Sequence, residues 1–245
     1  MGKSKNLVII PTYNEKENIE SILQYVLQLK EPFDVLVVDD HSPDGTAGLV
    51  KSLQSKYPES IHLIEREGKL GLGTAYLKGF EWAIDHDYWL ICEMDADFSH
   101  NPDDLLRLAS ACHQGAGMAI GSRYVSGVTV INWPIGRVLL SYFASRYVRW
   151  ITRMPAQDPT SGFVCYRKEV LQAIDLDKVR FKGYAFQIGM KFYAWKLGFS
   201  LVEIPIIFTD RRLGESKMNG GIFNEAVFGV LLMKFRSIFA SYYRK

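Results

Sequence analysis

Short runs of β-branched and other apolar residues alternate with segments of helical periodicity through the first half of the chain. Five of these runs are expected to be strands, namely Leu7–Ile10, Val35–Val38, Ile61–Ile64, Tyr88–Met94 and Gly117–Ile120. Helices are expected between them, at Glu15–Leu29, Thr46–Lys56, Thr74–Ile84 and Pro102–His113. Successive strands lie about 27 residues apart, which is close to the usual length of a βαβ unit. The pattern predicts an α/β fold with a mostly parallel sheet flanked by helices.

The size and composition of the chain fit one globular domain. It has 245 residues, of which 48% are hydrophobic, and domains commonly run to roughly 100–200 residues or somewhat more in α/β proteins. No segment rich in proline, glycine or serine divides the chain. We therefore expect one domain over residues 1–220 and a C-terminal elaboration over residues 221–245.

Charge and cysteine content exclude several function classes. The chain carries 29 basic and 27 acidic residues, whereas a nucleic-acid-binding protein normally has an excess of Lys and Arg. Its three cysteines form no Cys-x-x-Cys pair, which fits reduced thiols in the cytoplasm and not a zinc site. The longest uncharged apolar run, Ala226 to Met233, is far shorter than the roughly 20 residues of a membrane helix. We expect no nucleic-acid partner and no membrane span, although the chain could lie on a membrane surface.

Polar and glycine-bearing segments follow the predicted strands, at the edge where open α/β sheets bind ligands. They are Pro11–Glu15, Asp39–Thr46, Gly68–Tyr76, Met94–His100 and Gly121–Arg123. Asp95 and Asp97 close the fourth strand, where period-two alternation places both carboxylates on one side. Two carboxylates can share one hard cation, whose remaining ligands are usually phosphate oxygens and water. The pair therefore predicts a Mg²⁺ or Mn²⁺ site and a diphosphate ligand.

Other roles are open to these segments. Asp95 and Asp97 could cap the following helix, but Asn101–Asp104 already provides a cap, a first-turn proline and first-turn acids. Gly71–Gly73 begins a dinucleotide fingerprint without completing it, so no nicotinamide cofactor is expected.

The segment from Leu105 to Gln157 contains six arginines but no Asp, Glu or Lys, and part of it, near residues 136–153, is expected to be a helix. At about 100° per residue, its polar and its large apolar side chains fall on opposite halves of that helix. The polar half comprises Arg137, Ser141, Ser145, Arg149 and Arg153, with Arg146 at its margin; the apolar half comprises Leu139, Leu140, Phe143, Tyr147, Trp150 and Ile151. The helix could pack its apolar half on the core under a solvated arginine face. Alternatively, it could meet a membrane surface or an anionic lipid head, since Arg binds phosphate and aromatic residues favour the interface.

The C-terminus has the same basic and aromatic character. After Glu225 it contains four basic residues and no acid, with apolar residues at near-helical spacing. We expect an amphipathic helix over residues 221–245 that lies on a membrane surface, with core packing as the alternative. Before it, a strand is expected over Val202–Phe208, followed by a loop whose Arg211 and Lys217 could close over a phosphate group.

Eight motifs occur in an order that resembles one known family. They are Pro11–Glu15, Asp39–Thr46, Gly71–Tyr76, Met94–His100, Gly121–Tyr124, Thr160–Phe163, Lys182–Gln187 and Asp210–Lys217. Together they resemble family 2 glycosyltransferases, and within these the dolichol-phosphate or polyprenol-monophosphate mannose synthases. The resemblance implies a GT-A fold, a GDP-mannose donor, a divalent cation and a dolichyl or polyprenyl phosphate acceptor. It also implies a peripheral position on the cytosolic face of a membrane, with a membrane-anchoring protein partner as a possibility.

The resemblance also implies roles for individual residues. The nucleotide sugar would be bound by Pro11, Tyr13, Glu15, Val38, Asp40, Ala96 and Lys217, the metal by Asp95, Asp97 and Ser99, and the acceptor phosphate by Arg123, Arg137 and Ser141. Asp95, Asp97, Arg123 and Arg211 would form the catalytic set. Two positions depart from the family pattern. Ser99 stands where some members have a glutamine ligand, and Gly189 stands where relatives commonly have an acid.

The implied reaction suits this set of residues. An isoprenyl phosphate is already an anionic nucleophile, so it needs no general base, and the chain shows no histidine-based catalytic set. We expect in-line displacement at the anomeric carbon with inversion, giving a β-linked mannosyl phosphate. Asp158 is the candidate base if the acceptor is a hydroxyl instead. The alternatives are another family 2 enzyme, with a UDP-glucose or UDP-GlcNAc donor or a hydroxyl acceptor, and a sugar-nucleotide-binding module without activity.

Overall fold

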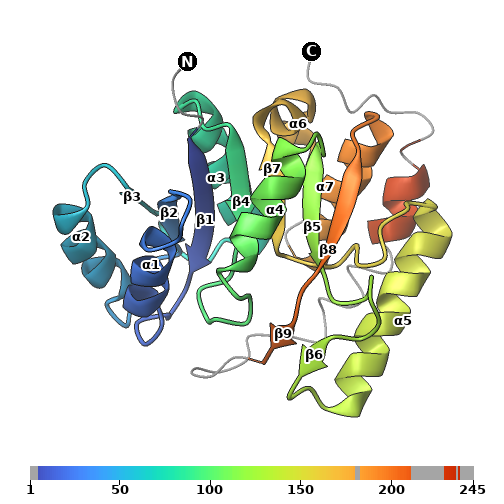
Figure 1. Ribbon diagram of the computed structural model, residues 1–245, viewed down its shortest axis with the longest axis horizontal. Coiled ribbons are helices and arrows are strands. Elements are labelled where there is room, and N and C mark those ends of the chain that lie inside the picture. The colour runs from blue at the N-terminus through green and yellow to red at the C-terminus, as the bar shows by residue number, and fades with distance from the viewer. Residues whose placement is uncertain (1–4, 180–182, 211–228, 236, 238–245) are drawn as a thin grey trace.

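A seven-stranded sheet forms the centre of the computed structural model, which describes residues 5–179, 183–210, 229–235 and 237. Its strands are β1 (Asn6–Thr12), β2 (Asp34–Asp39), β3 (Ile61–Glu65), β4 (Leu90–Glu93), β5 (Met118–Ser122), β7 (Val164–Arg167) and β8 (Leu201–Pro205). They are arranged in the order β3-β2-β1-β4-β7-β5-β8, and β7 alone among them runs antiparallel to its neighbours (Figure 1). The predicted α/β class with a mostly parallel sheet is therefore confirmed.

Helices cover both faces of the sheet. On one face lie α1 (Ile19–Leu27), α2 (Thr46–Lys56) and α4 (Asp104–His113); on the other lie α3 (Leu72–Asp85), α6 (Lys168–Ala173) and α7 (Tyr184–Lys196). Side chains of β1 alternate between the two layers, because successive residues of a strand point to opposite faces. Thus Val8 and Ile10 pack with α1 and α4, whereas Leu7 and Ile9 pack with α3. A Cβ atom on Gly79 would lie 2.8 Å from Ile9 Cγ2, so glycine is what lets α3 approach β1 this closely.

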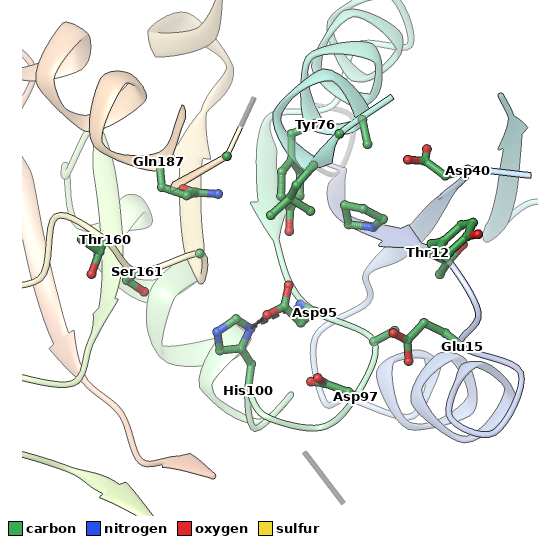
Figure 2. Close-up of a pocket in the computed structure, with 18 of the residues that line it drawn as sticks. Thr12, Glu15, Asp40, Tyr76, Asp95, Asp97, His100, Thr160, Ser161 and Gln187 are labelled. Carbon is green, nitrogen blue, oxygen red and sulfur yellow. Dashed lines mark hydrogen bonds and ion pairs between the residues drawn. The ribbon is translucent and has the colours of Figure 1, made fainter. Parts of the chain in front are cut away.

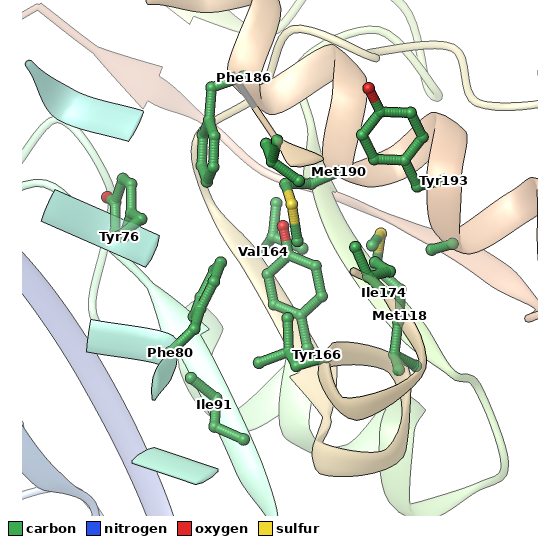
Figure 3. Close-up of a cluster of buried hydrophobic side chains, with 14 of the residues drawn as sticks. Tyr76, Phe80, Ile91, Met118, Val164, Tyr166, Ile174, Phe186, Met190 and Tyr193 are labelled. Carbon is green, nitrogen blue, oxygen red and sulfur yellow. The ribbon is translucent and has the colours of Figure 1, made fainter. Parts of the chain in front are cut away.

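Aromatic side chains fill the layer between α3 and α7. Tyr76 and Phe80 of α3 meet Phe186 of α7 over Tyr166 of β7 (Figure 3). Ring centroids lie 5.4 Å apart for Phe80 and Tyr166 and 6.0 Å apart for Tyr76 and Phe186, within the range of favourable aromatic pairs. This cluster fixes α3 against the antiparallel strand.

The structure differs from the sequence-based expectation in three elements. The antiparallel strand β7 lies between β4 and β5, which the parallel pattern did not indicate. The strand expected over Val202–Phe208 is split into β8 and a short β9 (Phe208–Thr209), which pairs with β6 (Val130–Ile131). Strand β4 ends at Glu93, so the acids at 95 and 97 lie in the loop after it, not on the strand.

The helix expected near residues 136–153 is present as α5 (Ile135–Thr152), at the edge of the molecule beyond β8 (Figure 1). Its buried residues are Ser145, Val148 and Thr152, on or next to its polar half. Its apolar half is largely exposed, with Phe143 at 61% and Trp150 at 77% exposure. Tyr147 and Ile151 pack against the core, but the other four apolar residues are exposed. The first of the two interpretations, a solvated arginine face over a core-packed stripe, therefore describes only the margin of this helix.

The described part of the C-terminal segment is helical over residues 229–235 and lies beside α5 (Figure 1). Val230 and Met233 pack into the core with Val148 of α5, whereas Phe235 is exposed. The boundary expected at residue 220 and most of the helix expected over 221–245 lie outside the described residues. Within the described part, the structure has no helix that combines the length and the apolar character needed to cross a membrane.

Candidate functional site

A cavity of about 480 Å³ opens at the carboxyl ends of β1, β2 and β4. Nine of the predicted site residues line it: Pro11, Tyr13, Glu15, Asp40, Asp95, Ala96, Asp97, Arg123 and Arg137. Several of them appear in Figure 2, which shows Glu15, Asp95 and Asp97 reaching the same space from the loops after β1 and β4. The fold thus brings together residues that are far apart in sequence, at the edge where parallel strands place ligands.

The loops after β1 and β2 are held together by one buried carboxylate. Thr12 Oγ1 donates to Asp39 Oδ1 at 2.7 Å, and the backbone N–H of Ser42 donates to Asp39 Oδ2 at 2.8 Å. Ser42 Oγ in turn accepts the backbone N–H of Asn14. Asp39 therefore organises the wall of the cavity from within the protein, whereas its neighbour Asp40 lines it.

Asp40 already has a cationic partner. Arg66 Nε donates to Asp40 Oδ1 at 2.6 Å, and both side chains are over nine-tenths buried. The same guanidinium donates through Nη1 to Thr74 Oγ1 at 2.7 Å, at the start of α3. Arg66 thereby connects the β2 edge to the glycine-bearing loop before α3.

The loop after β4 carries the two predicted metal ligands. Within it, the backbone N–H of Ser99 donates to Asp97 Oδ1 at 3.1 Å, and the backbone N–H of Asp95 donates to His100 Nδ1 at 3.2 Å. Phe98 adopts a positive φ of 59°, which is uncommon for a residue other than glycine and turns the chain sharply. Burial lowers the pKa of His100 to about 4, so its neutral ring accepts the Asp95 hydrogen bond and stacks on Phe163 at 4.7 Å.

The donor set fits a divalent cation that shares its ligands with a substrate. Asp95 and Asp97 both line the cavity, and carboxylate oxygens are the ligands that Mg²⁺ and Mn²⁺ prefer. No group of three or more His, Cys, Asp or Glu residues in the described part of the chain could hold a metal by itself. Any cation here would complete its coordination with oxygens of a bound phosphate and water.

Arg123 is locked in place by Asp158. The Asp158 carboxylate accepts Arg123 Nε and Nη2, both at 2.7 Å, and the Arg123 backbone N–H at 3.0 Å. Burial alone would raise the pKa of Asp158, but the guanidinium outweighs it and lowers the pKa. The Asp158 carboxylate is fully buried, both its oxygens accept hydrogen bonds from Arg123, and it does not line the cavity, so its contacts favour a positioning role over the role of a base.

Arg137 reaches the cavity from the first turn of α5. Its guanidinium carbon lies 4.0 Å from the centre of the Trp133 ring, and its Nη1 donates to Asp210 Oδ1 at 3.0 Å. Both partners of the ion pair are about one-third exposed. Arg137 is therefore oriented by two contacts while it remains accessible from the cavity.

Three predicted residues do not line the cavity. The Val38 side chain is fully buried in β2, and Ser141 Oγ accepts the hydroxyl of Tyr124 at 2.7 Å. The Ser99 hydroxyl is buried and has no hydrogen-bond partner among the described residues. Arg211 and Lys217 lie outside the described residues.

A buried polar network behind the cavity was not indicated by the sequence. Gln187 lines the cavity and donates through Nε2 to Glu93 Oε2 at 2.6 Å. Lys191 Nζ donates to Gln187 Oε1 at 3.2 Å and to the Ser161 carbonyl at 2.7 Å. Burial raises the pKa of Glu93 to about 7 and lowers that of Lys191 to about 8. Glu93 and Lys191 hold Gln187 at both ends of its amide. Gln187 and Ser161 occurred in motifs, whereas Glu93 and Lys191 did not.

Tyr76 ended one of the sequence motifs, but the sequence assigned it no role. It lines the cavity, is fully buried, and its hydroxyl has no hydrogen-bond partner in the described structure (Figure 2). Burial and then the nearby Asp95 raise its pKa well above the usual value, so the hydroxyl keeps its proton. Because buried hydroxyls nearly always have a partner, this one is available to a ligand.

Comparisons with known proteins agree with this arrangement. The family model described as Glycosyl transferase family 2 matches residues 7–175. The chain is 49% identical over 226 residues to the polyprenol monophosphomannose synthase of Mycolicibacterium smegmatis, covering 92% of this chain and 85% of that protein. It is 46% identical over 224 residues to the undecaprenyl-phosphate mannosyltransferase of Micrococcus luteus, covering 91% of each.

A solved structure extends the agreement to the fold. The mannosyltransferase of Pyrobaculum calidifontis in complex with GDP-Man and Mn²⁺ has a TM-score of 0.58 and 18% identity, covering 98% of this chain and 66% of that one. The sheet and its helices have the GT-A arrangement of such neighbours. From the match of the family model and the two similar relatives, we conclude that the chain belongs to glycosyl transferase family 2.

Proposed function

We propose that this glycosyltransferase transfers mannose from GDP-mannose to a dolichyl or polyprenyl monophosphate, with inversion, to give a β-linked lipid-phosphate mannose. The observation that carries the proposal is one cavity lined by both the acids Asp95 and Asp97 and the basic residues Arg123 and Arg137. An acidic pair suits a cation on a diphosphate donor, and arginines suit a phosphate acceptor. The two relatives above, named for mannose transfer to isoprenyl phosphates, support the same substrates.

The donor side of the cavity follows from the loops after β1, β2 and β4. We assign the nucleotide to Pro11, Tyr13, Glu15, Asp40 and Ala96, which line the cavity, with Val38 limited to backbone contact. Asp95 and Asp97 would hold Mg²⁺ or Mn²⁺, and the buried hydroxyl of Ser99 stays a predicted third ligand. The cation, when bound, offsets negative charge that develops on the GDP leaving group.

Tyr76 fits a contact with the transferred sugar. Its protonated hydroxyl is buried, lacks a partner in the described structure, and lines the same cavity as Asp95 and Asp97. A sugar hydroxyl placed there would accept its hydrogen bond and remove the cost of leaving it unpaired. Tyr76 therefore contributes to donor binding in this proposal.

The acceptor side requires positioning more than proton transfer. An oxygen of the acceptor phosphate attacks the anomeric carbon, and the bond from that carbon to the GDP β-phosphate oxygen breaks as GDP leaves with its electron pair. Arg123, held by Asp158, and Arg137, stacked on Trp133, would keep the acceptor anion beside the donor diphosphate. Ser141, placed outside the cavity, would act on the acceptor only through Tyr124. Arg211 and Lys217 stay predicted contacts of the phosphates.

The exposed apolar half of α5 supports action at a membrane surface. Its outward side chains, with Phe143 and Trp150 most prominent, would enter the headgroup region, as interfacial amphipathic helices do. We therefore propose a peripheral position on a membrane, and the resemblance to the family implies its cytosolic face. A membrane-anchoring protein partner remains a prediction.

The test is transfer of labelled mannose from GDP-mannose to a detergent-dispersed polyprenyl phosphate, with Mg²⁺ or Mn²⁺. We expect extractable product that EDTA abolishes, and a loss of at least about 10²-fold in Asp97→Asn, since removing a group that stabilises transition-state charge costs this much. Asp85→Asn, which removes an exposed acid at the end of α3, is the matched control and should retain activity.

Three outcomes would contradict the proposal. Product from UDP-sugars but not from GDP-mannose would identify another family 2 transferase. Transfer to a hydroxyl acceptor alone would exclude the lipid phosphate. Binding of GDP-mannose without turnover under any of these conditions would identify a binding module.

A further inference from the structure

The six arginines between Leu105 and Gln157 fall into two groups. One group is ion-paired: Arg107 with Asp104 at 2.6 Å, Arg123 with Asp158 at 2.7 Å, and Arg137 with Asp210 at 3.0 Å. The other group, here called the arginine cluster, consists of Arg146, Arg149 and Arg153 at the C-terminal end of α5. None of the three forms an ion pair with an acid in the described part of the chain.

The cluster is electrostatically unfavourable by itself. Arg146 and Arg149 lie three residues apart on the helix and Arg153 follows as its C-cap residue, so their like charges repel across adjacent turns. The negative C-terminal end of the helix dipole offsets this repulsion only in part. Because α5 contains no acidic residue, only an anion from outside the helix could neutralise the cluster.

The cluster lines a second cavity, which is shallow, open to solvent and distinct from the one at the strand ends. Its volume is about 430 Å³, and Trp150, Met154 and Pro155 complete its lining. Arg149 is anchored there through Nη1, which donates to Gln157 Oε1, whereas its Nε is buried with no hydrogen-bond partner among the described residues. An anchored guanidinium presents its other donors in the fixed fork that suits a phosphate group.

The position of the cavity on α5 indicates the source of the anion. At about 100° per residue, Arg146 projects on the same side as Ile135, Leu139 and Trp150, and Arg153, the C-cap residue with a φ of 60°, is also exposed. This outer side is therefore apolar over the first turns of the helix and basic over its last turns. Ile135 is 73% exposed and Trp150 77%, and tryptophan favours the headgroup level of a membrane. A cation beside an exposed apolar face meets the phosphates of a lipid bilayer when that face is buried.

The geometry points to a binding site for the phosphodiester of an anionic phospholipid headgroup, formed by Arg146, Arg149 and Arg153 around the Trp150 cavity. The inference rests on the membrane location within the proposed function. Arg137 and Arg149 are twelve residues apart, or about 18 Å along the helix, so the headgroup is separate from the acceptor phosphate. A phospholipid would bind at one end of α5 and the acceptor at the other. Together they would orient the cavity at the strand ends relative to the bilayer.

The experiment is co-sedimentation of the full chain with phosphatidylcholine vesicles, with and without phosphatidylglycerol, in the absence of donor and acceptor. A basic residue near an anionic surface contributes about fivefold to binding, so Arg146→Gln/Arg153→Gln is expected to weaken binding to phosphatidylglycerol vesicles by roughly 25-fold. The loss should shrink as salt is raised, since the attraction is screened. The matched control is Lys51→Gln/Lys56→Gln, which removes two exposed charges from α2, on the opposite side of the molecule (Figure 1). It should bind like the wild type, and thermal unfolding checks that each variant is folded.

Further arms separate the headgroup from other sources of phosphate. Arg146→Lys/Arg153→Lys keeps the positive charges but removes the planar guanidinium groups. Partial recovery of vesicle binding, relative to the glutamine variant, supports a phosphodiester bound in the site. Full recovery would show diffuse electrostatic attraction and overturn the site. Equal loss in the α2 control, or wild-type binding by the cluster variant, would also overturn it. Loss of transfer to a detergent-dispersed acceptor in the cluster variant would instead assign the cluster to the acceptor phosphate. Because vesicle binding needs no turnover, its failure is distinguishable from failure of the proposed transferase activity.

Discussion

The first half of the chain and helix α5 orient their apolar side chains in opposite ways. In the first half, α4 buries Leu105, Leu108 and Ala109 against the sheet, and polar groups gather at the strand ends. Helix α5 is almost twice as long, yet it buries Ser145, Val148 and Thr152 and exposes most of its large apolar residues. Two amphipathic helices of the same protein thus bury opposite faces: α4 buries its apolar face and α5 its polar face.

The difference follows from the partners that the fold offers each helix. Next to α5, Asp210 and Gln157 hold Arg137 and Arg149 on its inward side. A buried polar face is stable only when such partners exist, because an unpaired buried polar group is costly. The first half therefore buries its apolar side chains within the protein, whereas α5 leaves an apolar surface exposed.

The largest expected effect is on stability, when a leucine is replaced by alanine in each of the two helices. Leu108→Ala in α4 should lower the free energy of unfolding by about 2–5 kcal/mol, because it leaves a cavity in a fully buried position. Leu139→Ala in α5, which starts half-exposed, should cost less than about 0.5 kcal/mol. Urea unfolding measures both. Equal losses of stability would show that α5 buries its apolar side as α4 does, and would contradict the difference between the two helices.

Arg137→Ala tests the inward side of α5. We expect transfer to polyprenyl phosphate to fall by about 10- to 100-fold, in the range for truncating a charged hydrogen-bonding group at a binding site, with GDP affinity nearly unchanged. Acceptor titrations and calorimetric GDP binding provide the two measurements. If both fall together, the Arg137–Asp210 pair supports the whole cavity and not the acceptor side alone.

Tyr76→Phe tests the donor side and is the smallest of the three effects. Loss of one hydroxyl that hydrogen-bonds the sugar should reduce kcat/KM for GDP-mannose by about fivefold, with stability unchanged or raised, since the hydroxyl has no partner within the described structure. Steady-state kinetics with varied donor and, separately, varied acceptor would detect this. An effect that appears only in the acceptor series would move Tyr76 to the other side of the reaction.

Several features could be predicted from local sequence. The strands β1, β2 and β3 and the helix α2 lie within a few residues of their expected bounds, since their apolar periodicity is strong and their connections are short. Asp95 and Asp97 meet Pro11, Tyr13 and Glu15 in one cavity because parallel strands end at the same edge. The two acids were expected on the strand, however, and this was wrong: β4 stops at Glu93, and the turn at Phe98 and a hydrogen bond to His100 hold the loop that carries them.

Residues close together in the chain account for the parallel first half, the acidic edge and the two-faced character of α5, so local patterns were enough to predict these features. The tertiary structure decided which side of α5 faces inward, where β7 inserts, and that Asp158 holds Arg123 instead of acting as a base. Each of these depends on contacts between residues distant in sequence. Periodicity shows that a helix has two faces, but only its neighbours decide which face is buried.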